Sequence, residues 1–300
     1  MDNNNMVNSE ISELLQGSYD LHVHTAPDPF HDRPLTALEI ARLAHEAQMG
    51  GFVLKSHQFP TVHTANIVTD IYPGLSVIGS IVLNIEVGGL NPYAVEAAAK
   101  LSAQIIWMPT YSAQFRIPEF QNHRFVDSTY VKKVIQSGGI SILDEEGKLL
   151  PEVFDILDIV KFHDITLASG HLSPNEKIIL FKEACERGIS KLIATHPDDK
   201  ASMEEQKLMV NAGAKIEFPF LSCMPTDRGL SPENLIEKIR AVGVNNCIVT
   251  TDFGQLPNPS PVEGMRMAIA TLLHQGMTND EVQALVRINP LSLIGDRNNR

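Results

Sequence analysis

The sequence predicts an α/β fold, a (β/α)8 TIM barrel that spans residues 1–300 as a single domain. Short apolar runs alternate with amphipathic, helix-like stretches along the whole chain. The runs are apolar nearly throughout, as in parallel strands covered by helices on both faces. At 300 residues, an eight-stranded barrel is the economical closure of this pattern. The alternative is an open doubly wound sheet, but in this sequence no glycine-rich phosphate loop follows the first strand.

The expected elements follow one another in a regular order. The strands are expected over 19–24, 51–56, 76–84, 104–108, 165–169, 191–195, 214–218 and 246–251. Amphipathic, helix-like segments lie between them, such as 35–48, 92–102, 126–137, 174–187, 201–212, 231–242 and 262–275. Several of them begin with residues that favour a helix N-terminus, namely Thr36, Asn91-Pro92, Ser173-Pro174 and Ser231-Pro232. Residues 138–150 predict a small hairpin insertion between strands four and five, and the proline-rich run 256–261 predicts a stiff loop after strand eight.

Composition and charge narrow the class of function. Charged residues make up 20% and hydrophobic residues 43%, which is an ordinary globular composition. The net charge of -12 argues against a nucleic acid or an anionic membrane surface as the main partner. No apolar run approaches the ~20 residues of a membrane span, the first residues do not resemble a signal peptide, and the three cysteines form no CxxC. We therefore expect a cytoplasmic protein that acts on a small molecule. We also expect it to be a homo-oligomer.

Metal-ligand residue types gather at the ends of the expected strands. His22 and His24 are two residues apart on the first strand, so their side chains share a face. Because the C-terminal strand ends of a barrel share one mouth, the other candidates are expected near them. These candidates are Lys55 and His57 after strand two, Glu86 after strand three, and His171, His196 and Asp252 at the ends of strands five, six and eight. Neutral imidazoles with a carboxylate favour a divalent metal, with zinc preferred and manganese or iron as alternatives.

The order of these residues resembles that of the amidohydrolase superfamily. The resemblance rests on His22, His24, His171, His196 and Asp252, and on the tail Asn289-Pro290-Leu291-Ser292-Leu293-Ile294-Gly295. It spans about residues 19–295, while the stretches 88–92 and 107–110 look like a poorly characterised branch. It implies a TIM-barrel, metal-dependent hydrolase with these five side chains at the metal.

One departure from the superfamily pattern concerns the number of metal ions. Two-metal members carry a carbamylated lysine or a glutamate on strand four, and residues 105–110 contain neither. Lys55, as a carbamate, or Glu86 could take that place. Otherwise Lys55 would pair with Glu86 or hold a substrate carboxylate. The sequence thus allows one or two metal ions per chain.

A metal-bound water ionises near pH ~7, so the expected reaction is hydrolysis by a metal-bound hydroxide. Asp252 is expected to act as general base, and His196 or His57 to polarise the carbonyl. The expected target is a C–N or C–O bond in an amide, cyclic amide or lactone. The alternatives are a phosphoesterase of the polymerase-and-histidinol-phosphatase type, which also begins Asp-Leu-His-x-His, a metal-dependent decarboxylase on the same scaffold, and a non-catalytic metal-binding barrel.

Two further groups of residues bear on the site. Asp20, Thr25 and Thr195 are candidates for hydrogen bonding to the metal-binding histidines. Loop residues that could bind an anionic substrate are Arg33, Tyr111, Arg116, Arg124 and Arg228.

Overall fold

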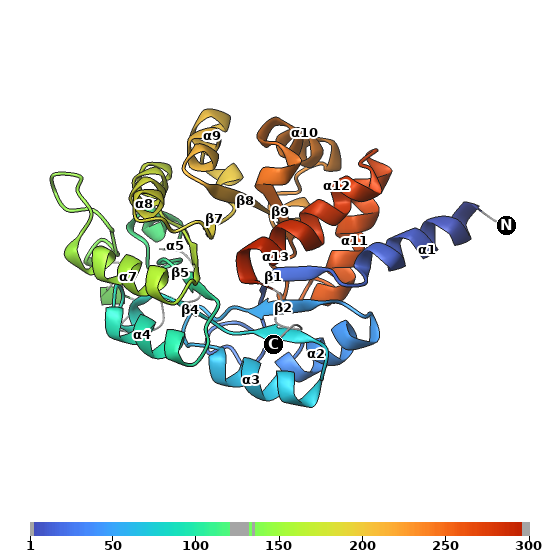
Figure 1. Ribbon diagram of the computed structural model, residues 1–300, viewed down its shortest axis with the longest axis horizontal. Helices are drawn as coiled ribbons and strands as arrows, with labels where there is room; N and C mark the ends of the chain where they lie inside the picture. Colours follow the sequence, from blue (N-terminus) through green and yellow to red (C-terminus); the bar gives the residue numbers. More distant parts are fainter. Residues whose placement is uncertain (1–2, 121–131, 134–135, 296–300) are drawn as a thin grey trace. The chain divides into compact units, whose positions relative to one another are not determined.

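The computed structural model describes residues 3–120, 132–133 and 136–295 (Figure 1). The chain forms two compact units. The first unit contains Met1–Leu54, His63–Ile78 and Glu217–Arg300, and the second contains Lys55–Val62 and Gly79–Ile216. The sequence-based prediction of a single domain over residues 1–300 stays a prediction.

The first unit is built on parallel strands. Strands β1 (Tyr19–Val23), β2 (Gly51–Leu54) and β3 (Ser76–Ile78) form a sheet in that order. Strand β9 (Cys247–Thr250) leads into residue Phe253, which bridges to Val23 of β1 in parallel orientation. All four strands are buried along their whole length. The helices of this unit are α1 (Asn3–Leu15), α2 (Ala37–Glu46), α3 (Val62–Ile71), α10 (Pro232–Val242), α11 (Pro261–His274), α12 (Asn279–Gln283) and α13 (Asn289–Ile294).

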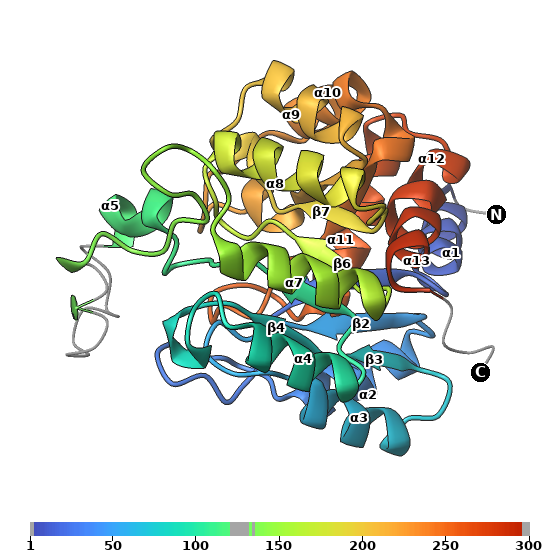
Figure 2. The same ribbon diagram turned by 60° about the vertical axis from the view of Figure 1, so that its left-hand side comes forward.

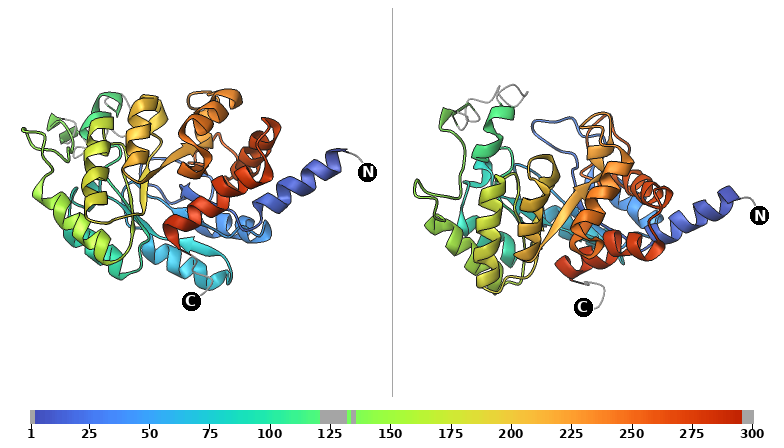
Figure 3. Two further views of the ribbon diagram at one scale, coloured as in Figure 1. Left: turned by 45° about the horizontal axis from the view of Figure 1, so that its top comes forward. Right: turned by 90° about the horizontal axis from the view of Figure 1, so that it is seen from above.

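The second unit repeats the pattern of parallel strand and helix. Its sheet has the order β4 (Ser80–Val82), β5 (Ile105–Trp107), β6 (Thr166–Ala168), β7 (Leu192–Ala194) and β8 (Ala214–Pro219), all parallel. The last residues of β8 belong to the first unit, where β9 follows β8 in the hydrogen-bonded order. The helices are α4 (Pro92–Lys100), α5 (Ile117–Phe120), α7 (Pro151–Phe162), α8 (Pro174–Glu186) and α9 (Met203–Asn211). Helix α4 packs against α7, and α8 packs against α9 (Figures 2 and 3).

The strands lie where the sequence predicts them, with one difference. The expected third strand, 76–84, is two short strands, β3 and β4, separated by Gly79. A Cβ atom at Gly79 would lie 2.4 Å from the Cα atom of Val62, so the backbones approach too closely for any side chain. This close approach fixes the break in the strand.

The helices also begin where the sequence predicts. Thr36 and Ser173 each accept a hydrogen bond from the backbone N–H three residues on, and the glutamate at that position caps them in return. Helices α1, α3 and α7 are not among the expected helices. In α1, Ile11, Leu14 and Leu15 form a buried stripe at helical spacing. Within the described residues, no helix combines the length and the apolar character needed to cross a membrane.

Two expected features lie in or near residues 121–135, of which the structure describes only 132 and 133. The helix expected over 126–137 falls largely outside the described residues, as does Arg124. In the expected hairpin, 138–150, Leu143 and Leu149 form one antiparallel bridge around a turn in which Gly147 donates to the Asp144 carbonyl. The insertion is therefore a tight turn with a minimal ladder.

Candidate metal centre

His22, His24 and Asp252 meet in the first unit because the backbone of 251–253 pairs with β1. The Asp252 N–H donates to the His22 carbonyl at 3.0 Å, and the His24 N–H donates to the Phe253 carbonyl at 2.9 Å. Asp252 Oδ1 then lies 3.0 Å from His22 Nε2 and 3.2 Å from His24 Nε2. Among the described residues, these three form the one group of His, Cys, Asp or Glu side chains whose ligand atoms all lie within 4.8 Å of one another.

Glycine is required beside this group. Gly254 has a φ of +135°, and a Cβ atom there would lie 2.2 Å from the His24 carbonyl oxygen. A side chain at this position would push the loop away from β1 and move Asp252 with it. Asp252 itself has a φ of +55°, in a region that aspartate tolerates better than most residues.

A buried carboxylate orients the first histidine. Glu217, on β8, is fully buried, and its Oε1 lies 2.7 Å from His22 Nδ1. The same oxygen accepts a hydrogen bond from the Thr250 hydroxyl at 2.8 Å. When Nδ1 of His22 donates its proton to Glu217 and Nε2 is deprotonated, the lone pair of Nε2 is available to a metal ion. This is the arrangement by which outer carboxylates fix the tautomer of metal-binding histidines.

Asp20 has a different role from the one that the sequence suggests. Its Oδ1 accepts hydrogen bonds from the backbone N–H groups of His22 and Thr251, and its Oδ2 accepts one from the Thr251 hydroxyl. Asp20 therefore links β1 to the residue that follows β9. The carboxylate that contacts the imidazole ring of His22 is Glu217. Burial raises the pKa of Asp20 to about 7.

The protonation states in this group suit metal binding. Burial, with a smaller contribution from the Arg33 guanidinium, lowers the pKa of His24 to about 3, so its imidazole is neutral at pH 7. Burial works against ionisation of Asp252, but His22 and His24 hold the pKa of its carboxyl well below its usual range. Metal ligands must be deprotonated, and both groups meet that condition.

Arg33 is held next to this group by an acidic partner. Its Nε donates to Asp28 Oδ2 at 3.0 Å, and its Nη2 lies 3.0 Å from the same oxygen. His31 Nδ1 lies 3.2 Å from Asp28 Oδ1. Burial opposes the ionisation of Asp28, but its hydrogen bonds with His31 and Phe30 and the charge of Arg33 lower its pKa.

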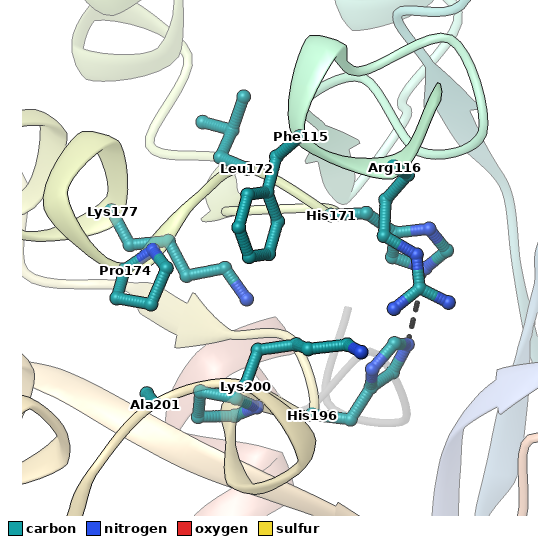
Figure 4. A pocket seen from close by; sticks show the side chains of 10 residues that line it. Phe115, Arg116, His171, Leu172, Pro174, Lys177, His196, Lys200 and Ala201 are labelled. Carbon is teal, nitrogen blue, oxygen red and sulfur yellow. Dashed lines mark hydrogen bonds between the residues drawn. The ribbon is translucent and has the colours of Figure 1, made fainter. Parts of the chain in front are cut away.

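In the second unit, the two histidines from strand ends point at each other. His171 Nε2 lies 3.1 Å from His196 Nε2, as the dashed line in Figure 4 marks. Burial and the neighbouring His196 hold the pKa of His171 well below its usual range. Gly170, with a φ of +55°, precedes His171, and a Cβ atom there would lie 2.2 Å from the Met108 carbonyl oxygen. Two imidazole nitrogens that face each other can share one proton and, when both are deprotonated, can bind one cation.

His57 is positioned by a short chain of polar groups that the sequence analysis missed. Thr110 Oγ1 lies 2.8 Å from His57 Nδ1 and accepts a hydrogen bond from Asn84 Nδ2 at 2.6 Å. Asn84 Oδ1 accepts from the Thr110 backbone N–H at 2.8 Å, which fixes the orientation of the amide. The His57 and His171 rings lie 6.3 Å apart, centroid to centroid.

The two candidates for a bridging ligand have other contacts. The Lys55 Nζ lies 4.6 Å from the centroid of the Trp107 ring, a cation–π distance. Glu86 Oε1 accepts a hydrogen bond from the Tyr111 hydroxyl, and burial raises the pKa of Glu86 to about 7. Within the described part of the second unit, neither Glu86 nor His57 completes a three-donor group with His171 and His196.

Comparisons with known proteins bear on the fold. A search of the curated proteins gives no match. An amidohydrolase from Pseudomonas aeruginosa superposes with a TM-score of 0.65 at 12% identity, over 97% of this chain and 98% of that chain. A probable dipeptidase, PvdM, from Pseudomonas aeruginosa gives 0.66 at 12% identity, over 98% and 99%. A 2,6-dihydroxybenzoate decarboxylase, in complex with 2,6-dihydroxybenzoate, gives 0.56 at 11% identity, over 93% and 99%.

These similarities confirm the predicted fold class, a (β/α)8 barrel. At such low identity they show the fold alone. A match at the level of sequence covers residues 17–217, which is more than half of the chain. The chain therefore belongs to the family of unknown function DUF6282.

Proposed function

We propose that the protein is a metal-dependent hydrolase that attacks an amide, cyclic amide or lactone bond of a small, polar, anionic molecule. The observation that carries this proposal is the convergence of His22, His24 and Asp252, with the Nδ1 atom of His22 held by buried Glu217. Burying three polar side chains around one point is costly, and packing of a core does not require it. Their convergence therefore supports a metal site. The fold of the superfamily adds support without identifying the reaction.

The donor set of the first unit fits a divalent metal. Two neutral imidazoles and one carboxylate suit zinc, and also manganese or iron. In the second unit, His171 and His196 offer two further nitrogens 3.1 Å apart. A divalent ion held by such ligands would act as a Lewis acid and activate water at neutral pH.

The chain's own residues supply the proton transfers and the positioning. Asp252 is ionised at neutral pH, so it can accept a proton from the attacking water and later pass it to the leaving group. Glu217 keeps the ring of His22 in one tautomer and one orientation. His196 is proposed either to hold a metal with His171 or to donate to the carbonyl oxygen of the substrate.

Metal-dependent decarboxylation is the second candidate, and one contact favours it. The Lys55 Nζ stacks over the Trp107 ring, which is a favourable place for an ammonium group and an unfavourable one for a carbamate. Without a bridging carbamate, a single metal ion is the simpler arrangement. A decarboxylase is also among the proteins with similar structures.

The test is metal content per chain, measured by elemental analysis on protein purified without an affinity tag. We expect at least one divalent ion per chain in the wild-type protein and its loss in His24→Ala. The matched control is His63→Ala, which removes an exposed histidine of the same unit. Equal metal content in wild type and His24→Ala would overturn the proposal. Two ions would direct substrate screening to amides and lactones, and one ion to decarboxylation as well.

A further inference from the structure

A cationic pocket lies beside His171 and His196 in the second unit (Figure 4). Its walls come from three places: Arg116 in the 3-10 turn Gln114–Arg116, Lys177 in the first turns of α8, and Lys200 after the turn Pro197–Asp199. The space among these side chains is partly open to solvent. No aspartate or glutamate is among the described residues that line it.

The cations keep their charged ends near this space. Figure 4 shows the ammonium groups of Lys177 and Lys200 and the guanidinium of Arg116 directed toward it from different walls. Lys177 is only 5% exposed, and its Nζ donates to the Thr195 backbone carbonyl at 2.9 Å. That carbonyl compensates the burial of the ammonium group and fixes it at the wall of the pocket.

One carboxylate serves two of the three cations. Glu119 Oε2 lies 3.0 Å from Arg116 Nη2, and Glu119 Oε1 lies 2.6 Å from Lys200 Nζ. The Glu119 side chain is 40% exposed, so solvent screens its charge. Lys177 comes from another wall, and α8 directs the positive end of its dipole toward the same region. The balance of charge at the pocket therefore favours an anion.

We propose that this pocket binds a small oxyanion, the carboxylate or phosphate group of the substrate, and holds it beside the His171–His196 pair. The guanidinium of Arg116 matches the two oxygens of such a group, and the two lysines add point charges. This proposal rests on the proposed function only in assigning the anion to a substrate.

The experiment is titration calorimetry on the protein as purified, with inorganic phosphate and malonate as separate probes. We expect saturable binding of at least one anion, weakened about tenfold by Lys200→Gln and by Arg116→Gln, the loss typical of a charged hydrogen bond. The matched control is Lys207→Gln, which makes the same change of charge at an exposed position of α9 and leaves affinity within about twofold. Tighter binding of phosphate would indicate a phosphate-bearing substrate, and tighter binding of malonate a carboxylate.

Two further measurements separate this pocket from the metal centre. His24→Ala should lose its metal and keep anion binding, and Lys200→Gln should keep its metal and lose anion affinity. Absence of binding by both probes would overturn the pocket while the metal content still stands. Binding that disappears with a chelator but is unchanged in Lys200→Gln would also overturn it, since the anion would then be bound by metal.

Discussion

The two units surround their histidines with opposite charge. In the first unit, the His22 and His24 rings face Asp252, and Glu217 lies behind His22. In the second unit, His171 faces another histidine, and the nearby charged groups that affect it include Lys55 and Arg116. A site that contains carboxylates attracts a metal ion electrostatically. At imidazoles next to cationic side chains, a bound anion would be needed to offset the repulsion between those cations and a metal ion. We therefore expect the first unit to bind a metal ion more tightly than the second, and we propose that the second contacts the substrate.

The largest expected effect tests which unit binds metal more tightly. Asp252→Ala removes the oxygen that faces both imidazoles of the first unit, so we expect zinc affinity to fall more than about 100-fold, beyond the loss typical of an outer residue. His171→Ala should cost less at the tightest site. The measurement is competition with a chromophoric chelator, with circular dichroism to verify folding. A larger loss in His171→Ala would reverse the comparison.

The next effect concerns the groups behind the histidines. Glu217→Gln replaces the carboxylate that accepts from His22 Nδ1 with a neutral amide, and we expect zinc affinity to fall about 10- to 100-fold. Thr110→Val removes the hydroxyl beside His57 Nδ1 in the second unit and should have a smaller effect, because that hydroxyl carries no charge. Both variants are measured in the same chelator competition. Equal effects would show that the charge of Glu217 contributes nothing.

Both units share one backbone device, and its removal tests whether they are equally rigid. Gly254→Ala and Gly170→Ala would each place a Cβ atom 2.2 Å from a carbonyl oxygen, in the left-handed half of φ. We expect each to lower the free energy of unfolding by about 2–4 kcal/mol, measured by urea denaturation. Gly74→Ala, with a φ of +90° and nothing within 4 Å, measures the cost of φ alone, about 1 kcal/mol. If Gly254→Ala and Gly170→Ala lower the free energy of unfolding no more than Gly74→Ala does, the backbone of these loops can shift to accommodate a Cβ atom.

The sequence predicts the fold well because its signals are local. Alternating apolar runs locate the strands, and Thr36, Ser173 and Ser231 locate the helix starts. Helices α1, α3 and α7 lie outside the expected helices, although the apolar spacing of α1 is visible in the sequence. The division of 76–84 at Gly79 depends on a contact with Val62, which spacing along the chain does not reveal.

The candidate site shows the same limit. The meeting of His22, His24 and Asp252 follows from their places at strand ends, and the structure brings them together. The position of Glu217 behind His22 depends on the packing of β8, 195 residues away along the chain. A signal was present, since Glu217 is a charged residue inside the apolar run Ile216–Phe218. Burying a carboxylate in a strand is costly without a partner. The histidines expected at the strand ends are candidates for the partner of Glu217.

The smallest expected effect is on the pH dependence of stability, and it has opposite signs in the two units. Asp28 in the first unit has a pKa below its unfolded value of 3.8, so it stabilises the fold above that pH, and this contribution disappears as pH falls. Asp28→Asn should flatten the acid side of the stability profile by about 1 kcal/mol. Arg42→Gln, which removes an exposed ion pair with Glu46, is the control.

Glu86 in the second unit behaves in the opposite sense. Its pKa is about 7 in the folded chain and 4.5 in the reference state, so between those pH values the folded protein binds more protons than the unfolded one. Its contribution to the free energy of unfolding therefore falls as pH rises through this range and is constant above it. Glu86→Gln should raise stability at pH 8 relative to pH 5, while Asp28→Asn should change the profile only below about pH 4, as measured by urea denaturation across pH. A Glu86→Gln profile parallel to wild type would mean that Tyr111 and the surrounding groups stabilise the Glu86 carboxylate as well as water does.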